Sequence, residues 1–237
     1  MFLKQQCFCH SLVTFLISWE YPTKTGIGCN TMNKDDTANF LSFLQELRLD
    51  PTGHKLILTA STPILPYNGP DGSPLTDVSG FAKVLNHIEI MNYDIWGPWS
   101  PTVGPNAPLN DTCAATANQA GSAVSAVLKW HAAGMPWNQI VLGVAAYGHS
   151  FEVPNNDAFV SGSKNILAPY PKFDSSAHPS GDSWDSGSGV DVCGNPVSPG
   201  GVIDFWGMIQ LGYLNSDGSL KNGIFSRYDS CSQTVSF

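Results

Sequence analysis

The chain has 237 residues, enough for a sizeable core, and its 42% hydrophobic and 13% charged residues are typical of a globular protein. A formal net charge of -8 with only 11 lysines and arginines argues against a nucleic-acid partner, because phosphates require a basic surface. The sequence holds no apolar run of about 20 residues, so we expect no membrane-spanning helix. A neutral polymer such as a polysaccharide suits this charge balance.

The N-terminal stretch has Lys4 followed by apolar residues through Ile17, a pattern shared with secretory signal peptides. No small-x-small cleavage site precedes Trp19, and cleavage there would remove a core strand. We therefore expect a strand or translated non-coding sequence here, and no signal peptide.

Apolar, β-branched runs predict strands at 13–18 and 55–60. Between them, apolar residues recur at helical spacing over 35–47, and Asn33 or Asp35 is suited to the N-cap of that helix. This part of the chain is expected to form a strand, helix, strand unit.

The same alternation continues with a short helix over 76–85 and a strand over 88–92. A long alanine-rich helix is expected from Thr112 through Ala133, ending at Gly134, and a fourth strand over 139–145. Strands that alternate with helices predict an α/β fold with a parallel sheet.

Four motifs point to one family. They are Ile17-Ser18-Trp19-Glu20-Tyr21-Pro22, Ile88 to Asp94 with its Met-Asn-Tyr-Asp ending, Ile140 to Phe151 with its Tyr-Gly pair, and Phe225 to Thr234. In their residues and order these segments resemble glycoside hydrolase family 18, the chitinases, and the fungal branch in particular. The resemblance covers roughly residues 17 to 234.

This resemblance implies a (β/α)8 TIM barrel, which usually needs about 250 residues before insertions. We interpret residues 1–150 as a partial barrel, about strands four to seven, and residues 151–237 as an incomplete α+β subdomain inserted near the C-terminus. The chain is thus expected to be truncated at both ends relative to the family.

The family's chemistry is hydrolysis of β-1,4-linked N-acetylglucosamine polymers with retention of configuration. The acetamido oxygen of the substrate serves as nucleophile, so no enzyme nucleophile is needed. The resemblance makes Glu20 the general acid. It also puts Val13, Leu16 and Ser18 where the family has aspartates, and a serine cannot stabilise the developing cation as an aspartate does. We therefore predict impaired hydrolysis.

The resemblance also assigns substrate contacts at the strand ends. Trp19 and Tyr21 are expected to surround Glu20 and the sugar, and Met91 to lie under the sugar ring. Tyr93 is expected to donate to the acetamido oxygen, and Asp94 to contact sugar hydroxyls or the acid.

Further aromatic residues follow two of the strands. Trp99 matches the sugar-stacking position of the family, whereas Trp96 is expected to pack in the interior. Tyr147 also ends a strand and is interpreted either as a substrate contact or as a core tyrosine. His149, beside the proposed cleft, is expected to be structural.

The six histidines have no metal-ligand spacing, so we expect no metal and no organic cofactor. The six cysteines fit no zinc motif and are expected in disulfides; 15 pairings exist, of which Cys193 with Cys231 and Cys29 with Cys113 are reasonable. The sequon at Asn110 and the family resemblance predict an extracellular parent protein.

Two functional hypotheses and one inactive alternative result. The chain is a chitinase with Glu20 as acid, or a non-catalytic chitin-binding module, or an inactive fragment. Its partners would be chitin or chito-oligosaccharides, with no nucleic acid or membrane, and we expect a monomer.

Overall fold

The computed structural model describes residues 2–7 and 13–237. The chain divides into two compact units, unit 1 with Met1–Asn92 and Ala123–Gly143, and unit 2 with Tyr93–Ser122 and Val144–Phe237. The sequence placed a boundary at residue 150, whereas the loop after Asn92 belongs with the C-terminal segment. The division into a partial barrel over residues 1–150 and an inserted subdomain over residues 151–237 therefore stays a prediction.

Unit 1 is built on a five-stranded sheet in the order β1-β2-β3-β4-β5. Its strands are β1 (Phe2–Cys7), β2 (Val13–Ser18), β3 (Ile57–Thr62), β4 (His87–Ile90) and β5 (Ile140–Leu142). Strands β2 to β5 pair in parallel, which confirms the four predicted strands and the α/β character. The first strand, β1, runs antiparallel to β2 and covers its edge. The signal-peptide question partly concerns residues 8–12, which lie outside the described residues.

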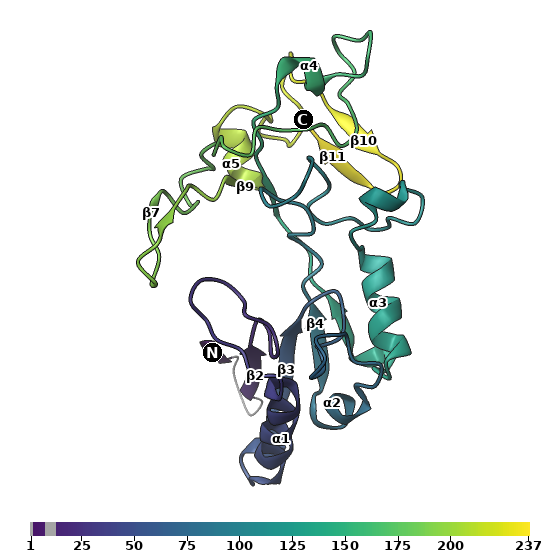
Figure 1. Ribbon diagram of the computed structural model, residues 1–237, viewed down its shortest axis with the longest axis vertical. Coiled ribbons are helices and arrows are strands. Elements are labelled where there is room, and N and C mark those ends of the chain that lie inside the picture. The colour runs from purple at the N-terminus through teal and green to yellow at the C-terminus, as the bar shows by residue number, and fades with distance from the viewer. Residues whose placement is uncertain (1, 8–12) are drawn as a thin grey trace. The chain divides into compact units, whose positions relative to one another are not determined.

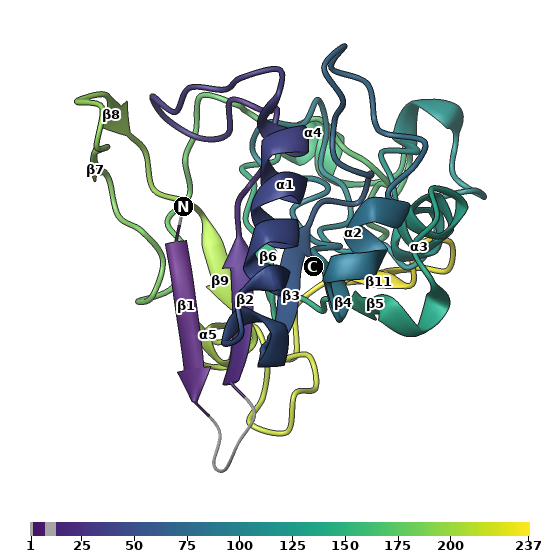
Figure 2. The same ribbon diagram turned by 90° about the horizontal axis from the view of Figure 1, so that it is seen from below.

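Three helices connect the parallel strands: α1 (Asp36–Leu49), α2 (Ser79–Val84) and α3 (Ala123–Ala132). They follow one another along the sheet (Figure 1; Figure 2). The core of unit 1 joins residues of all three helices to the strands, with Phe40, Phe81 and Trp130 at most 2% exposed. Short 3-10 turns lie at Gly53–Lys55 and Trp137–Gln139.

The predicted helix from Thr112 to Ala133 is wrong in its first half. Only a 3-10 turn at Thr116–Asn118 forms there, and α3 begins at Ala123. Gly121 has a φ of 121°, which interrupts a helix, and the Asp111 carboxylate accepts hydrogen bonds from the Gly121 amide and the Ser122 hydroxyl. The predicted end of the helix is confirmed, since Gly134 has a φ of 100°.

Unit 2 contains two short helices and three two-stranded sheets. The helices are α4 (Asn155–Ala158) and α5 (Phe205–Gln210), and the strand pairs are β6 (Tyr147–His149) with β9 (Val202–Asp204), β7 (Gly189–Val190) with β8 (Pro196–Val197), and β10 (Arg227–Asp229) with β11 (Thr234–Ser236). All three pairs are antiparallel.

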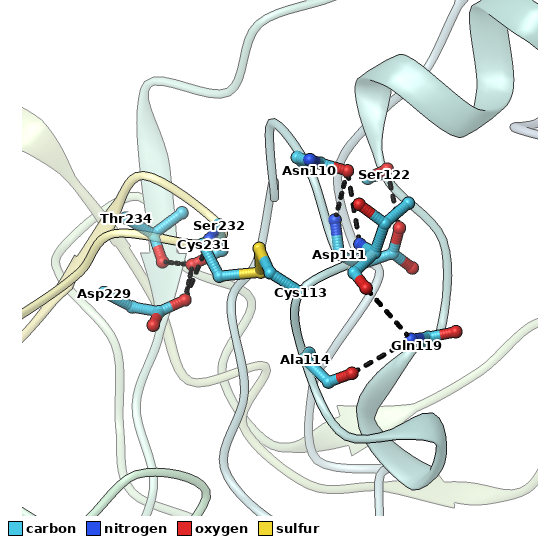
Figure 3. The surroundings of a disulfide bond; sticks show 11 residues. Asn110, Asp111, Cys113, Ala114, Gln119, Ser122, Asp229, Cys231, Ser232 and Thr234 are labelled. Carbon is cyan, nitrogen blue, oxygen red and sulfur yellow. Dashed lines mark hydrogen bonds between the residues drawn. A yellow bond between two sulfur atoms is a disulfide. The ribbon is translucent and has the colours of Figure 1, made fainter.

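A disulfide between Cys113 and Cys231 fastens the loop before α3 to the β10–β11 turn within unit 2 (Figure 3). The predicted pairings of these two cysteines are therefore wrong, because separations along the chain do not reveal which loops meet. Around the bond, the Ser232 hydroxyl donates to Asp229, and the Asp111 and Thr112 amides donate to the Asn110 side chain. Cys29 and Cys193 are also disulfide-bonded.

Candidate active site

The carboxyl end of β2 in unit 1 carries the motif that contains the predicted acid. Strand β2 ends at Ser18, whose hydroxyl donates a hydrogen bond of 2.5 Å to Oε1 of Glu20. The peptide bond between Glu20 and Tyr21 is cis. The Ser18 hydroxyl therefore contacts the carboxyl group of the predicted acid directly.

The aromatic residues of this motif pack inward. Trp19 and Tyr21 are half-buried against the core, and the ring of Trp19 lies edge-on to Phe40, with centroids 5.6 Å apart. Glu20 itself is exposed. The expected packing of Glu20 among aromatic rings is therefore wrong, because the neighbouring rings cover the core instead.

Met91 follows β4 in the same unit and is half-buried. Its backbone amide donates to the Thr62 carbonyl at the end of β3, at 2.8 Å. The strand end is thus fixed, and the role of Met91 beneath a sugar ring stays a prediction.

Unit 2 brings together Asp94 and the end of the Tyr-Gly motif. The Tyr147 hydroxyl donates to Asp94 Oδ1 at 2.7 Å, and His149 Nε2 lies 2.8 Å from the same oxygen. The hydrogen bond from His149, followed by that from Tyr147, holds the pKa of Asp94 below its usual range against the opposing effect of burial. The pKa of Tyr147 is raised, first by burial and then by its bond to Asp94.

Asn106, in the Gly-Pro-Asn-Ala-Pro loop, holds this arrangement through its side-chain amide. Its Oδ1 accepts from the Asp94 amide at 2.8 Å, and its Nδ2 donates to the Tyr147 carbonyl at 2.9 Å. Asp94 has a φ of 56°, in the left-handed region, which an aspartate adopts more easily than most residues. Asn106 thus links the two chain segments that carry the cluster.

The aromatic residues of unit 2 separate as predicted. Trp96 is 3% exposed and packs near Tyr170, whereas Trp99 is 64% exposed. The Trp99 ring lies edge-on to His149, with centroids 5.4 Å apart. The rings of Tyr93 and Tyr147 are also edge-on to each other, with centroids 6.1 Å apart. An exposed indole beside a polar cluster is a surface that suits the apolar face of a pyranose.

Comparison with models of known protein families gives the same family as the motifs. The sequence model of the glycosyl hydrolases family 18 matches residues 15–231. The chain belongs to this family. Within the described residues, no group of three or more metal-ligating side chains occurs. None of the helices among residues 2–7 and 13–237 is both long and apolar enough to cross a bilayer.

Two known proteins are similar to this chain over most of its length. A chitinase-like effector of Moniliophthora roreri is 59% identical over 218 residues, covering 92% of this chain and 52% of that protein. A chitinase-like effector of Moniliophthora perniciosa is 53% identical over 226 residues, covering 95% of this chain and 51% of that protein. The chain therefore spans about half the length of these relatives.

Among solved structures, a chitinase from Rhizomucor miehei superposes with a TM-score of 0.79 at 31% identity. The match covers 93% of this chain and 57% of that one. The fold of this family 18 chain is thus similar to that of a fungal chitinase over nearly its entire length.

Sequence reasoning found most of the cluster in unit 2 but missed two members. The structure brings together Tyr93, Asp94, Trp99 and Tyr147, while Trp19, Glu20, Tyr21 and Met91 lie at strand ends of unit 1. Asn106 had no signal in the sequence, because a single asparagine between two prolines is typical of any loop. His149 was judged structural, although its position two residues after Tyr147 on β6 places both side chains on the same face of the strand.

Proposed function

We propose that this family 18 chain binds chito-oligosaccharides, polymers of β-1,4-linked N-acetylglucosamine, and that its hydrolytic activity is impaired. The observation that carries the proposal is the cluster of Asp94, Tyr147 and His149 beside the exposed Trp99 in unit 2. It offers a fixed carboxylate for a sugar hydroxyl or amide and an indole face for the ring. Both are neutral-sugar contacts and suit the acidic balance of the chain.

The expected loss of activity follows from the end of β2. A retaining, substrate-assisted mechanism needs Glu20 as general acid and a neighbouring carboxylate that orients the acetamido group and balances the developing positive charge. Ser18 instead donates a hydrogen bond to Glu20 and brings no charge. Losing one preorganised charged partner typically costs about a hundredfold in rate, or roughly 3 kcal/mol.

The relatives support both halves of this proposal. Two proteins that are 59% and 53% identical are named chitinase-like effectors, whereas Chitinase A1 of Niallia circulans, 32% identical over 169 residues, is named an enzyme. The proposal extends the carbohydrate recognition implied by these names to the present chain, with an extracellular location. The substrate-assisted mechanism calls for no metal or organic cofactor, and we propose a monomer.

For the architecture, we propose that the parallel strands β2 to β5 are strands four to seven of a (β/α)8 barrel. The segment after residue 150 would then be the α+β subdomain inserted into that barrel. The parallel pairing of β2 to β5 and the likeness to the fungal chitinase support this assignment.

A second candidate is an active chitinase, which the presence of Glu20 and of the intact Met-Asn-Tyr-Asp segment favours. Calorimetric titration with N-acetylglucosamine tetramers, together with product analysis on the same samples, separates the two. Cello-oligosaccharides of equal length are the matched control, because they lack the acetamido group. Binding without turnover is the expected result, whereas turnover near that of intact family members would establish the active chitinase. If calorimetry shows no binding and product analysis shows no cleavage, both candidate functions are refuted.

A further inference from the structure

His149 is a buried histidine whose two ring nitrogens have different surroundings. Its side chain is 6% exposed, and Nε2 lies 2.8 Å from Asp94 Oδ1. Nδ1 is buried and has no hydrogen-bond partner among the described residues. Because a carboxylate only accepts, Nε2 carries a hydrogen and donates a hydrogen bond to Asp94, whether or not Nδ1 is also protonated. The one strong bond of this ring is therefore directed at Asp94.

Asp94 receives its side-chain hydrogen bonds asymmetrically. Both the Tyr147 hydroxyl and the His149 ring donate to Oδ1, and Oδ2 accepts no hydrogen bond from the described residues. The side chain nevertheless remains 47% exposed. Two donors on one oxygen fix the rotation of the carboxylate and leave the other oxygen for a ligand that donates a hydrogen bond.

The backbone of Asp94 is fixed independently of its side chain. Asn106 Oδ1 accepts from the Asp94 amide, while the backbone carbonyl of Asn106 accepts from the Ile95 amide at 3.1 Å. A residue with a φ of 56° needs such support to persist. Asn106 thus fixes the position of the Asp94 backbone, and His149 fixes the orientation of the Asp94 carboxylate.

The same imidazole also contacts the exposed indole. The planes of His149 and Trp99 meet at 78° in an edge-on arrangement. The Trp99 ring lies so close to Gly97 that a Cβ there would come within 2.4 Å of it. Gly97 and His149 therefore limit the positions that this indole can take, even though it is 64% exposed.

We propose that His149 is a positioning residue, which presents Oδ2 of Asp94 and the face of Trp99 together to one sugar of the ligand, with Asn106 fixing the Asp94 backbone. This inference rests on the proposed function for the identity of the ligand. The geometry that it describes exists without ligand and is tested separately.

The titratable groups in contact with Asp94 determine the pKa that a titration of its carboxyl would measure. His149 and Tyr147 from β6 donate to its carboxylate, and Tyr93 lies next to Tyr147. His149 and Tyr147 are thus the titratable groups that act on Asp94 within the described part of unit 2, and Tyr93 acts on Tyr147. Removing the donor at residue 149 should therefore raise the pKa of Asp94, because its ionised form loses a hydrogen bond.

The test uses two substitutions that separate the two contacts of the ring. His149→Gln keeps a donor that can reach Asp94 but removes the aromatic edge, whereas His149→Phe keeps an aromatic edge against Trp99 but removes the donor. The Asp94 carboxyl is titrated by NMR in the ligand-free full chain. We expect a raised Asp94 pKa in His149→Phe and a value close to the parent in His149→Gln; an unchanged value in His149→Phe would overturn the proposal.

Binding of the N-acetylglucosamine tetramer provides the second measurement. Loss of a hydrogen bond to a charged group predicts roughly tenfold weaker binding for His149→Phe. In an Asp94→Asn background the same substitution should have much less effect, because the pair no longer acts as a unit. An equal loss in both backgrounds would show that His149 serves the fold alone and would overturn the proposal.

The two proposals fail in distinguishable ways. If the parent chain binds no chito-oligosaccharide while the Asp94 titration shifts as expected, the proposed function fails and the positioning of Asp94 by His149 stands. If the tetramer binds and the Asp94 pKa does not shift in His149→Phe, the proposed function stands and the positioning of Asp94 by His149 fails.

Discussion

The hydroxyl of Ser18 donates a hydrogen bond of 2.5 Å to the carboxylate of Glu20, two residues further along the chain. A serine hydroxyl donates this bond and carries no charge, whereas an ionised aspartate side chain could only accept hydrogen bonds. The exposed Glu20 is thereby held by a neutral partner. The resemblance to family 18 predicts an aspartate at residue 18, so the charge of that carboxylate is what we expect this chain to lack.

Replacing this serine by aspartate should restore hydrolysis. We expect Ser18→Asp to raise the rate of chito-oligosaccharide cleavage about a hundredfold, because a charged partner returns beside the acetamido group. Release of products from the N-acetylglucosamine tetramer measures the effect. Ser18→Asn is the matched control, being of nearly equal size but neutral. If the two variants cleave equally, charge at residue 18 is not what limits the reaction.

Trp99 is expected to supply the stacking surface for the sugar. Trp99→Ala should weaken binding of the tetramer by roughly tenfold, since it removes an exposed indole of the proposed site. The matched control is Trp184→Ala, also in unit 2, where the indole is 80% exposed and contacts Trp206. Calorimetric titration gives both dissociation constants, and an equal loss in both variants would contradict a specific role for Trp99.

The dependence of binding on pH follows from Asp94. Its pKa is lowered in the folded chain, mainly by the bond from His149, so its ionised form persists below the usual aspartate range near 4. Since His149 Nε2 donates whether the ring is neutral or charged, we expect binding to stay constant from neutral pH to about pH 4 and to weaken only below it.

Titrations with the tetramer between pH 3 and 7 check this expectation, with Asp94→Asn as control. Asp94 contributes to binding while its carboxyl is ionised in the folded chain, and this contribution is lost as the pH falls through its lowered pKa. A loss of binding in the parent chain well above pH 4 that is missing in Asp94→Asn would assign an ordinary or raised pKa to Asp94 and contradict the prediction.

The parallel strands and α1 of unit 1 could be predicted because each has a local pattern, whereas the sequence predicts no separate strand for β1. Strands β3 and β4 overlap the predicted runs at 55–60 and 88–92, and α1 has apolar residues at helical spacing. The long helix failed because an alanine-rich segment favours helix locally, whereas a tertiary contact decided otherwise. The Asp111 carboxylate accepts hydrogen bonds from the amide of Gly121 and the hydroxyl of Ser122, so that α3 begins only at Ala123.

In the candidate site, too, the sequence predicts the local motifs but not the contacts between distant residues. Asp94 and Tyr147 belong to motifs that the sequence displays, but their hydrogen bond joins residues 53 positions apart, and that of Asn106 to Tyr147 spans 41. Such contacts depend on the paths of loops, which no local pattern determines. For the same reason the partner of Cys113 could not be chosen among 15 pairings.

The disulfide between Cys113 and Cys231 should contribute substantially to the stability of unit 2. It joins residues 118 positions apart, and closing a loop of this size restricts the unfolded chain by about 4 to 5 kcal/mol in the entropic account. We expect the double variant Cys113→Ser with Cys231→Ser to lose roughly that free energy of unfolding. Chemical denaturation of the oxidised proteins measures it, and an unchanged midpoint would contradict the expectation.

Arg48 is expected to be a principal polar support of unit 1. From α1 its guanidinium donates to three backbone carbonyls, of Gly53, Leu56 and Val84, and to the Asn86 side chain, with distances from 2.7 to 3.1 Å. The Asn86 side chain accepts in turn from the Leu58 amide of β3, so the network joins helix and sheet. Lysine cannot reproduce this fork, because its ammonium has a single nitrogen.

Arg48→Lys should therefore lower the free energy of unfolding by about 2 kcal/mol, as carbonyls in the connection between α1 and β4 lose their donors. The matched control is Lys34→Ala, since among the described residues Lys34 pairs with the adjacent exposed Asp35 alone, and the expected change there is below about 0.5 kcal/mol. Urea denaturation followed by circular dichroism compares the two. If Arg48→Lys is no less stable than the control, these carbonyls are satisfied by water, and packing of α1 against the sheet alone holds the unit together.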